Sequence, residues 1–359
     1  MTGQAPKKKS RATKPDIPEA GPYNPSWVDR LTGAVERLPM PYWFVYLVLF
    51  LVEVAIVHAV AWVDGWVPAF QFEPFAALFP IWLWGPLAIM TYLDAAALDA
   101  LRAFRPLLEV DDGALRQLEY ALATMPSRPV IISGLIWSAI YVINAYLVVP
   151  MWSNLYSIGP FATAFGIAVG LFSFFTGSTI YYHTIRQLRF VSQLVAKVPR
   201  FNLFRLDPVY AFSALTAQTG VAYLLLVSIT SLTFPFRLNP IPVIIFTILQ
   251  IVLALGAFAL PLWNVHRRLL SEKRSLLADL NRQVEAAIRR LHHYLDENDF
   301  GTVGGAKDAL TGLAAERDVL AKIPTWPWRA GTLTGILSAV ALPIVTFLIQ
   351  FILQRWLAR

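Results

Sequence analysis

Long apolar stretches dominate the hydrophobic pattern of the chain, and shorter polar stretches separate them. A bilayer core about 30 Å thick needs roughly 20 apolar residues per helix. Pro80 and Pro86 interrupt one stretch, and we expect a kinked span there because membrane helices tolerate proline. Seven stretches reach this length and are predicted to be transmembrane helices: Pro41–Val63, Phe75–Leu93, Val130–Pro150, Gly159–Tyr182, Val209–Phe234, Ile241–Trp263 and Thr332–Gln354.

Between the spans, the pattern changes to the spacing of amphipathic helices. Over residues 264–298, apolar residues recur every three, four or seven positions, which predicts a helix of about 30 residues with one apolar stripe. The glycines at 301, 304 and 305 are expected to end this helix, and a shorter helix is expected over Ala306–Lys322. Because isolated helices are only marginally stable, we expect these segments to pack as a cytoplasmic helical bundle. Solvated hairpins without an assembly role are the alternative.

The predicted fold class is therefore all-α, a polytopic membrane protein with seven transmembrane helices and cytoplasmic helical extensions. The pattern divides the chain into four parts. They are a cytoplasmic tail over 1–40, largely disordered to about residue 25; a six-helix transmembrane region over 41–263 with cytoplasmic extensions at 94–129 and 183–208; a cytoplasmic helical segment over 264–331; and the seventh transmembrane helix over 332–359.

Composition excludes a soluble protein of this size. The 359 residues are 57% hydrophobic and only 15% charged, whereas soluble domains carry about 25% charged residues. The chain has no cysteine, which excludes disulfides, thiolate metal sites and cysteine nucleophiles.

The basic residues predict the orientation, because cytoplasmic loops carry an excess of lysine and arginine. With seven spans, 27 of the 30 basic residues fall on one side. This asymmetry predicts a cytoplasmic N-terminus, an external C-terminus and a multi-pass protein of the bacterial plasma (inner) membrane. It also explains the net charge of +7 without a nucleic-acid partner.

The last predicted span carries uncharged polar residues at steps of four, which we expect to share one slowly rotating face. Such a stripe either lines water or hydrogen-bonds to neighbouring helices. The pore-lining candidates are Thr334, Ser338, Thr346, Gln350 and Gln354.

Two ionisable residues interrupt the first span. Glu53 lies midway along it, and His58 follows about 140° further round the helix. A membrane-buried carboxylate indicates either a proton or cation site, or a protonated side chain bonded to another helix. In the fourth span, Ala162, Gly166 and Gly170 form a small-residue face that is typical of close helix packing.

We find no motif of an enzyme, a cofactor site or a metal site, so we expect no catalytic residues and no cofactors. Seven spans, an internal N-terminus and a helical cytoplasmic base resemble the insect odorant and gustatory receptors. In that family four subunits form a cation channel whose last helix lines the pore. Thr346-Phe347 and Gln350-Phe351 are similar to the family's Thr-Tyr and Gln-Phe pairs, although Phe replaces Tyr and the two pairs lie closer together.

Three further segments are similar to a family of bacterial polytopic membrane proteins, a resemblance that implies a source and no activity. They are Phe104-Arg105-Pro106, Asn202-Leu203-Phe204 with the following Pro208–Ser213, and Pro324-Thr325-Trp326-Pro327-Trp328.

The leading hypothesis is a homo-oligomeric ion channel, a tetramer by resemblance, that lies in the lipid bilayer and opens to an unidentified small-molecule ligand. A proton-coupled secondary transporter that uses Glu53, and a membrane sensor or scaffold that signals through its cytoplasmic helices, are the alternatives.

Overall fold

The computed structural model describes residues 22–156, 158–198, 201–204, 206–233, 241–297 and 300–357. These residues form α-helices, two short 3-10 helices and one isolated bridge between Pro25 and Pro126. The helices are α1 (Trp27–Glu36), α2 (Tyr42–Asp64), η1 (Pro74–Ala77), α3 (Leu78–Phe104), η2 (Arg105–Leu107), α4 (Asp112–Ala123), α5 (Ser127–Tyr156), α6 (Pro160–Gly177), α7 (Thr179–Lys197), α8 (Asp207–Thr233), α9 (Ile241–Asp296), α10 (Phe300–Lys322) and α11 (Ala330–Leu357).

Six stretches of the described helices are long and apolar enough to cross a membrane, which is consistent with a multi-pass membrane protein. Each overlaps a predicted span. The other predicted span, Val130–Pro150, falls on α5, where the described side chains form a shorter apolar helix, Ser127–Ile143. The six stretches are Tyr42–Asp64, Pro74–Leu107, Pro160–Lys197, Asp207–Thr233, Thr247–Asp296 and Gly331–Gln350.

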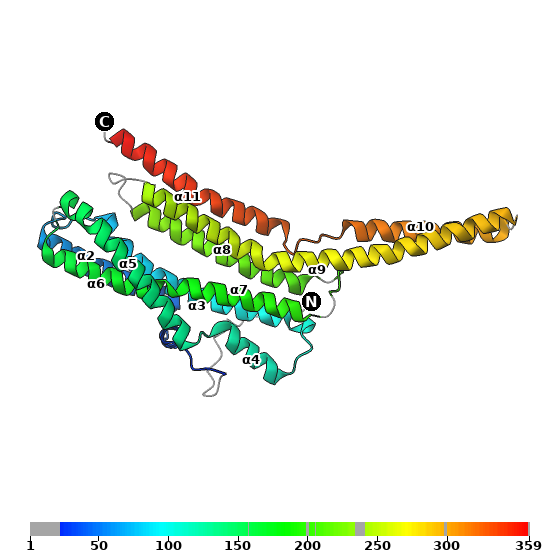
Figure 1. Cartoon of the computed structure of the whole chain (residues 1–359), viewed down its shortest axis with the longest axis horizontal. Helices are drawn as coiled ribbons and strands as arrows, with labels where there is room; N and C mark the ends of the chain where they lie inside the picture. The colour runs from blue at the N-terminus through cyan, green and yellow to red at the C-terminus, as the bar shows by residue number, and fades with distance from the viewer. Residues whose placement is uncertain are drawn as a thin grey trace, which may run out of the picture.

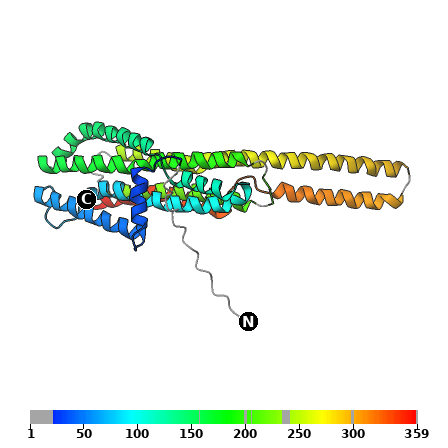
Figure 2. The same ribbon diagram turned by 90° about the horizontal axis from the view of Figure 1, so that it is seen from below.

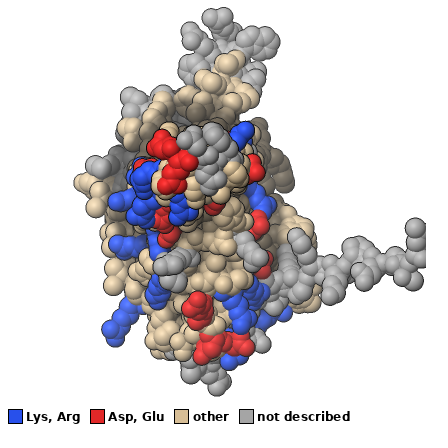
Figure 3. Space-filling model, turned by 90° about the vertical axis from the view of Figure 1, so that its right-hand side faces the viewer, with Lys and Arg blue, Asp and Glu red and all other residues tan. Residues whose placement is uncertain are grey.

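The long helices lie lengthwise beside one another, and α9 and α10 project together from one end of the bundle (Figure 1). We call this end the hairpin end and the opposite end, where α11 finishes, the far end. The short helix α1 runs across the bundle axis (Figure 2). Lys, Arg, Asp and Glu side chains gather at the hairpin end, which faces the viewer in Figure 3.

Helices α3 and α8 form the centre of the bundle. In their most apolar 18-residue windows, 61% and 67% of the residues are buried, against 17% for α2 and 11% for α11. The exposed residues of the outer helices include many large apolar side chains, among them Leu51, Ile56 and Ile349. Water would disfavour so much exposed apolar surface, whereas lipid tails accommodate it.

The chain is ordered from before α1, where it contacts the start of α5. Ser26 caps α1, and the Asp29 carboxylate accepts hydrogen bonds from the Ser26 backbone and from the Met125 N–H at 2.9 Å. The Tyr23 hydroxyl donates to the Thr124 carbonyl at 2.8 Å. These contacts begin at Tyr23, close to residue 25, where we expected the disordered tail to end. The rest of that tail, residues 1–21, lies outside the described residues.

The cytoplasmic hairpin differs from its prediction at the glycines. Gly301, Gly304 and Gly305 lie inside α10, which begins at Phe300, and do not break the helix. Glycine in a helix costs roughly 1 kcal/mol against alanine, and packing of α10 along α9 offsets that cost. Lys273 on α9 holds the two helices together near the end of α10. Its ammonium group donates hydrogen bonds to the carbonyls of Ala321 at 2.7 Å and of Ile323 at 2.8 Å.

Part of the expected helical bundle is present at the hairpin end. Arg268 on α9 donates to the Val195 and Val198 carbonyls at the end of α7, each at 2.5 Å. Leu269 is completely buried in the same apolar cluster as Val191. Beyond Leu280 the hairpin of α9 and α10 projects by itself, and most of its described side chains are exposed.

Candidate functional site

The five pore-lining candidates all lie on α11 but do not share one face. Thr334 and Ser338 are exposed, whereas Thr346 and Gln350 are half-buried. The Gln350 Oε1 atom is buried and has no hydrogen-bond partner among the described residues. The side chain of Gln354 lies outside the described side chains.

The helical period explains this separation. A helix turns by about 100° per residue, so a step of four overshoots a full turn by about 40°. From Thr334 to Gln350 the stripe therefore winds by about 160°, to nearly the opposite side of α11. One side, with Ile336 and Pro343 buried, packs on α8. Our expectation of a single polar face is corrected accordingly.

The exposed side of α11 begins polar and becomes apolar. Ser338 shares it with Leu342, Val345 and Ile349, because offsets of 4, 7 and 11 residues return to within about 40° of one direction. The exposed fractions of these three apolar side chains are 39%, 48% and 52%. The side that could meet another chain is therefore polar near the hairpin end and aliphatic toward the far end.

Glu53 is half-buried between two helices. Its Oε2 atom accepts a hydrogen bond of 2.5 Å from the indole N–H of Trp84 on α3. This geometry matches one of the two interpretations of Glu53, a side chain bonded to a neighbouring helix. It also leaves Glu53 on the lipid-facing helix α2, and His58 does not join it.

His58 instead holds the far-end connection between α2 and η1. Its Nδ1 atom lies 2.8 Å from the Val54 carbonyl, and its Nε2 atom accepts the Glu73 N–H at 3.1 Å. The ring also stacks on Phe72, with 4.9 Å between ring centroids. Both ring nitrogens of His58 therefore have partners, and the side chain anchors this connection.

The small-residue face of α6 is buried at two of its three predicted positions, Ala162 and Gly170. A Cβ added to Gly170 would overlap the Tyr141 hydroxyl, whereas a Cβ added to Gly166 would meet nothing within 4 Å. Ala162 is 7% exposed. The closest approach lies further on, at Gly177, where an added Cβ would overlap the backbone oxygen of Trp82 on α3.

The sequence analysis missed a buried ionisable pair. Asp94 on α3 and His183 on α7 meet through Oδ1 and Nε2 at 2.8 Å, and their side chains are 4% and 3% exposed. The pair lies between two apolar clusters, one containing Met90 and Ile180 and the other containing Ala97. Polar groups in such surroundings are costly and usually functional.

Further buried polar side chains lie on α2, α3, α7 and α8, and together with this pair we call them the polar layer. The Tyr223 hydroxyl on α8 lies 3.1 Å from Thr184 Oγ1, and the Tyr46 hydroxyl on α2 lies 3.1 Å from Thr91 Oγ1. Both amide atoms of Gln187 are buried without a partner among the described residues. Buried polar atoms normally have a hydrogen-bond partner, so Gln187 is an unusual side chain for these surroundings. The layer consists of Tyr46, Thr91, Asp94, His183, Thr184, Gln187 and Tyr223.

A sequence signal for this layer existed. Thr176, Thr179, His183 and Gln187 recur every three or four positions, which is the spacing of one helix face. Asp94 and His183 each come directly after the predicted end of a span, so both were placed in the predicted cytoplasmic extensions, 94–129 and 183–208. Span ends are the least certain part of such predictions, and the pair lay just beyond two of them.

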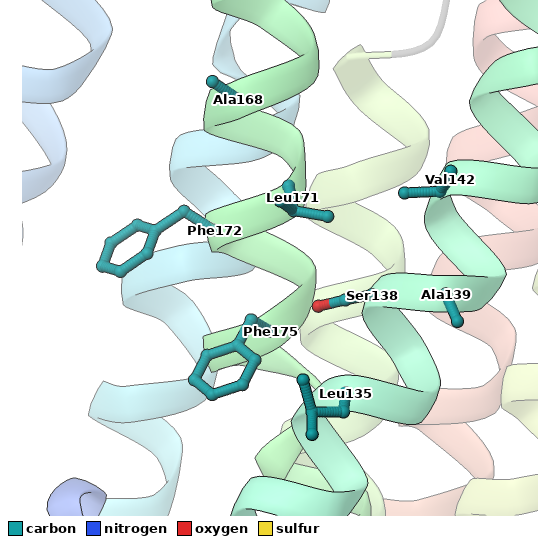
Figure 4. Close-up of a pocket in the computed structure, with 8 residues that line it drawn as sticks. All are labelled: Leu135, Ser138, Ala139, Val142, Ala168, Leu171, Phe172 and Phe175. Atoms are coloured by element: carbon teal, nitrogen blue, oxygen red, sulfur yellow. The ribbon is translucent and has the colours of Figure 1, made fainter.

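An apolar groove of about 450 Å³ lies between α5 and α6 (Figure 4). Leu135, Leu171 and Phe175 line it, and Ser138 supplies the one polar side chain of its lining. This groove offers no group for acid–base or ligand chemistry. The candidate functional regions are therefore the exposed side of α11 and the polar layer.

Comparison with protein-family models, with curated proteins and with solved structures found no match to this chain. No family is thereby identified, and the function has to be inferred from the arrangement of the helices and their side chains.

Proposed function

We propose that the protein is a homo-oligomeric ion channel in which α11 of each copy lines a shared axis. The observation that carries this proposal is the position of α11. Only 11% of its most apolar window is buried inside one chain, although its exposed side carries the hydroxyl group of Ser338. A water-lined axis would hydrate this hydroxyl group.

The same side suggests where such a channel closes. Rings of Ser338 would form a wet entrance near the hairpin end. Rings of Leu342, Val345 and Ile349 would form a hydrophobic constriction, which gates by excluding water. The half-buried Thr346 and Gln350 would instead hold α11 against α8. In this proposal, Ser338 is the one residue of the five predicted pore-lining candidates that lines the axis near the apolar constriction.

The excess of basic residues supports an orientation with the hairpin end in the cytoplasm and the end of α11 outside. The projecting hairpin would then contact other copies through its exposed apolar residues, including Leu276, Ile288 and Leu295. A tetramer is proposed from the resemblance to insect receptors. Reporter fusions after residues 113, 198 and 303 should report inside, and fusions after 70, 155 and 237 outside.

Conductance through the purified protein in liposomes tests the channel. Val345→Ser should wet the constriction and raise the basal cation flux by about ten-fold or more, because a dry barrier of 1.4 kcal/mol slows passage ten-fold. Ile344→Ser is the matched control. Its side chain is 50% exposed, against 48% for Val345, but points about 100° away. Equal flux in both variants and the wild type would contradict the proposal.

The polar layer favours a second candidate, proton-coupled transport. Asp94 and His183 are close enough, at 2.8 Å, to exchange one proton directly. This pair is a better proton site than Glu53, because both partners are almost completely buried. A flux that follows the imposed pH gradient and is lost in Asp94→Asn would favour the transporter over the channel.

A further inference from the structure

The connection between α2 and η1, residues 65–73, folds back along α2 at the far end. A glycine with a left-handed φ of 81° follows α2 and reverses the chain. The Phe70 ring then lies beside the Trp62 ring, with 5.6 Å between the centroids, and the Phe72 ring stacks on His58. His58 lies about 9 Å before the end of α2, at 1.5 Å per residue. The connection therefore runs beside the last two turns of α2 and not beyond them.

Side chains of α2 bind the backbone of this connection. The Trp62 indole N–H donates to the Gln71 carbonyl at 2.9 Å, and His58 Nε2 accepts the Glu73 N–H at 3.1 Å. Within the connection, the Gln71 N–H donates to the Pro68 carbonyl at 3.0 Å. In water such groups can bond to solvent, whereas beside lipid they need partners from the protein. These bonds are therefore what an irregular segment lying against lipid requires.

The surface of the connection is apolar and uncharged. Phe70 and Phe72 are 91% and 65% exposed, and Val63 in the last turn of α2 is 84% exposed. The stretch 65–72 contains no charged side chain. Phe70 also has a φ of 66°, which bulky residues rarely adopt, so its ring is held outward by an unfavourable backbone conformation. Water disfavours aromatic rings presented in this way, whereas an apolar environment accommodates them.

The occupant that fits this surface is lipid, because the surface continues the exposed side of α2. Only 17% of the most apolar window of α2 is buried, and Val52 and Ile56 are among its exposed side chains. With 23 residues, α2 is about 35 Å long, close to the roughly 30 Å of a hydrocarbon core. Its last turns therefore lie near the boundary between the hydrocarbon core and the head groups, where aromatic rings are enriched.

We propose that residues 65–73 form a membrane-inserted loop, in which Phe70 and Phe72 contact lipid in the leaflet at the far end while His58 and Trp62 fix the backbone. Phe72, beside His58, lies deeper in this arrangement than Phe70, beside Trp62. The proposal rests on the membrane location of the protein. It is independent of the channel, because none of these residues lies on α11 or in the polar layer.

Spin labels at single cysteines test the proposal on the full chain in nanodiscs of phosphatidylglycerol and phosphatidylethanolamine. The chain has no cysteine of its own, so each label occupies one site. Molecular oxygen concentrates in lipid and a polar nickel chelate stays in water, so the ratio of their collision rates with the label reports its depth. Gln283→Cys on the projecting part of α9 is the water reference, and Val52→Cys midway along α2 is the lipid reference.

Labels at Phe70→Cys and Phe72→Cys should show oxygen-to-nickel ratios several-fold above that of Gln283→Cys, and the ratio should be higher at Phe72→Cys. Ratios equal to the water reference would overturn the proposal, because the loop would then lie in solvent. Low collision rates with both reagents would also overturn it, because a second copy or another protein would then cover the loop.

A variant of His58 tests how the loop is held. His58→Phe keeps a ring that can stack on Phe72 but loses the acceptor for the Glu73 N–H. The released N–H then needs water, so the ratio at a Phe70→Cys label should fall several-fold toward the water reference. His292→Phe, at an exposed histidine of the hairpin, is the control and should leave the ratio unchanged. An unchanged ratio in folded His58→Phe would overturn the proposed anchoring.

Discussion

Asp94 and His183 join α3 to α7 through a contact of 2.8 Å that is almost completely shielded from solvent. A buried ion pair often adds little net stability, because desolvation of the two groups offsets their attraction. Removing one partner is different, since the other then remains buried without compensation. Single substitutions should therefore reveal the contact through a loss of stability, whereas replacing both residues together should have a smaller effect.

We predict that Asp94→Ala lowers the free energy of unfolding by about 3 kcal/mol or more, because it strands the His183 ring. The double variant Asp94→Ala/His183→Ala should lose less than the sum of the two single variants. Thermal unfolding in detergent measures both effects. Asp99→Ala, on the exposed side of the same helix, should change stability by no more than about 0.5 kcal/mol. Equal destabilisation by Asp94→Ala and Asp99→Ala would contradict the buried contact.

Gly177 tests the contact between α6 and α3. Gly177→Ala should destabilise the protein by about 1–3 kcal/mol, because the new methyl group has to displace the Trp82 backbone. Gly166→Ala is the matched control in the same helix. Nothing lies within 4 Å of the added Cβ there, so this variant should be neutral or slightly stabilising. Melting temperatures in detergent compare the two, and a reversed order would argue against the packing described.

The segment before α1 should loosen at high pH. Burial raises the pKa of Tyr23 from 10.0 to about 12, although the neighbouring Arg186 partly opposes the shift. A raised pKa means that the folded state holds its proton more tightly than the unfolded state. The contribution of Tyr23 is therefore complete below pH 10 and is lost as the pH rises toward about 12. Tyr23→Phe should remove this pH dependence, as measured by proteolysis of the segment between pH 9 and 12.

Glu53 should tolerate an amide but not an ammonium group. Glu53→Gln keeps an oxygen that can accept from the Trp84 indole, so folding and membrane insertion should be preserved. In Glu53→Lys, the ammonium group would face the indole N–H of Trp84, and both groups are donors. The substitution also brings a positive charge into the middle of a span, so the amount of correctly assembled protein should fall. Fluorescence-detected gel filtration after detergent extraction compares the variants. Normal assembly of Glu53→Lys would show that Glu53 faces water.

The apolar stretches were predictable because they depend on local pattern. The prediction that Gly301 helps to end the helix was wrong, because packing of α10 on α9 outweighs the local preference for a break. Long-range contacts overrode a propensity that is weak by itself.

The candidate site was harder to predict because it depends on which sides of helices meet. Steps of four residues suggested one polar side of α11, but the twist of the helix carries Thr334 and Gln350 apart. Asp94 and His183 are 89 positions apart in the chain, so no local pattern pairs them. Their contact requires the packing of α3 against α7, and no local pattern in the sequence indicates which helices pack together.

Disulfide formation between copies is the most direct test of the central claim that α11 helices meet along their exposed side. The chain has no cysteine, so single cysteines can be introduced at Val345 on α11 and at Val52 on α2, where both side chains are about half exposed, 48% and 51%. After oxidation in native membranes, the Val345→Cys protein should migrate as a covalent dimer and the Val52→Cys protein as a monomer. A monomer for both variants, or equal cross-linking of both, would contradict a shared axis lined by α11.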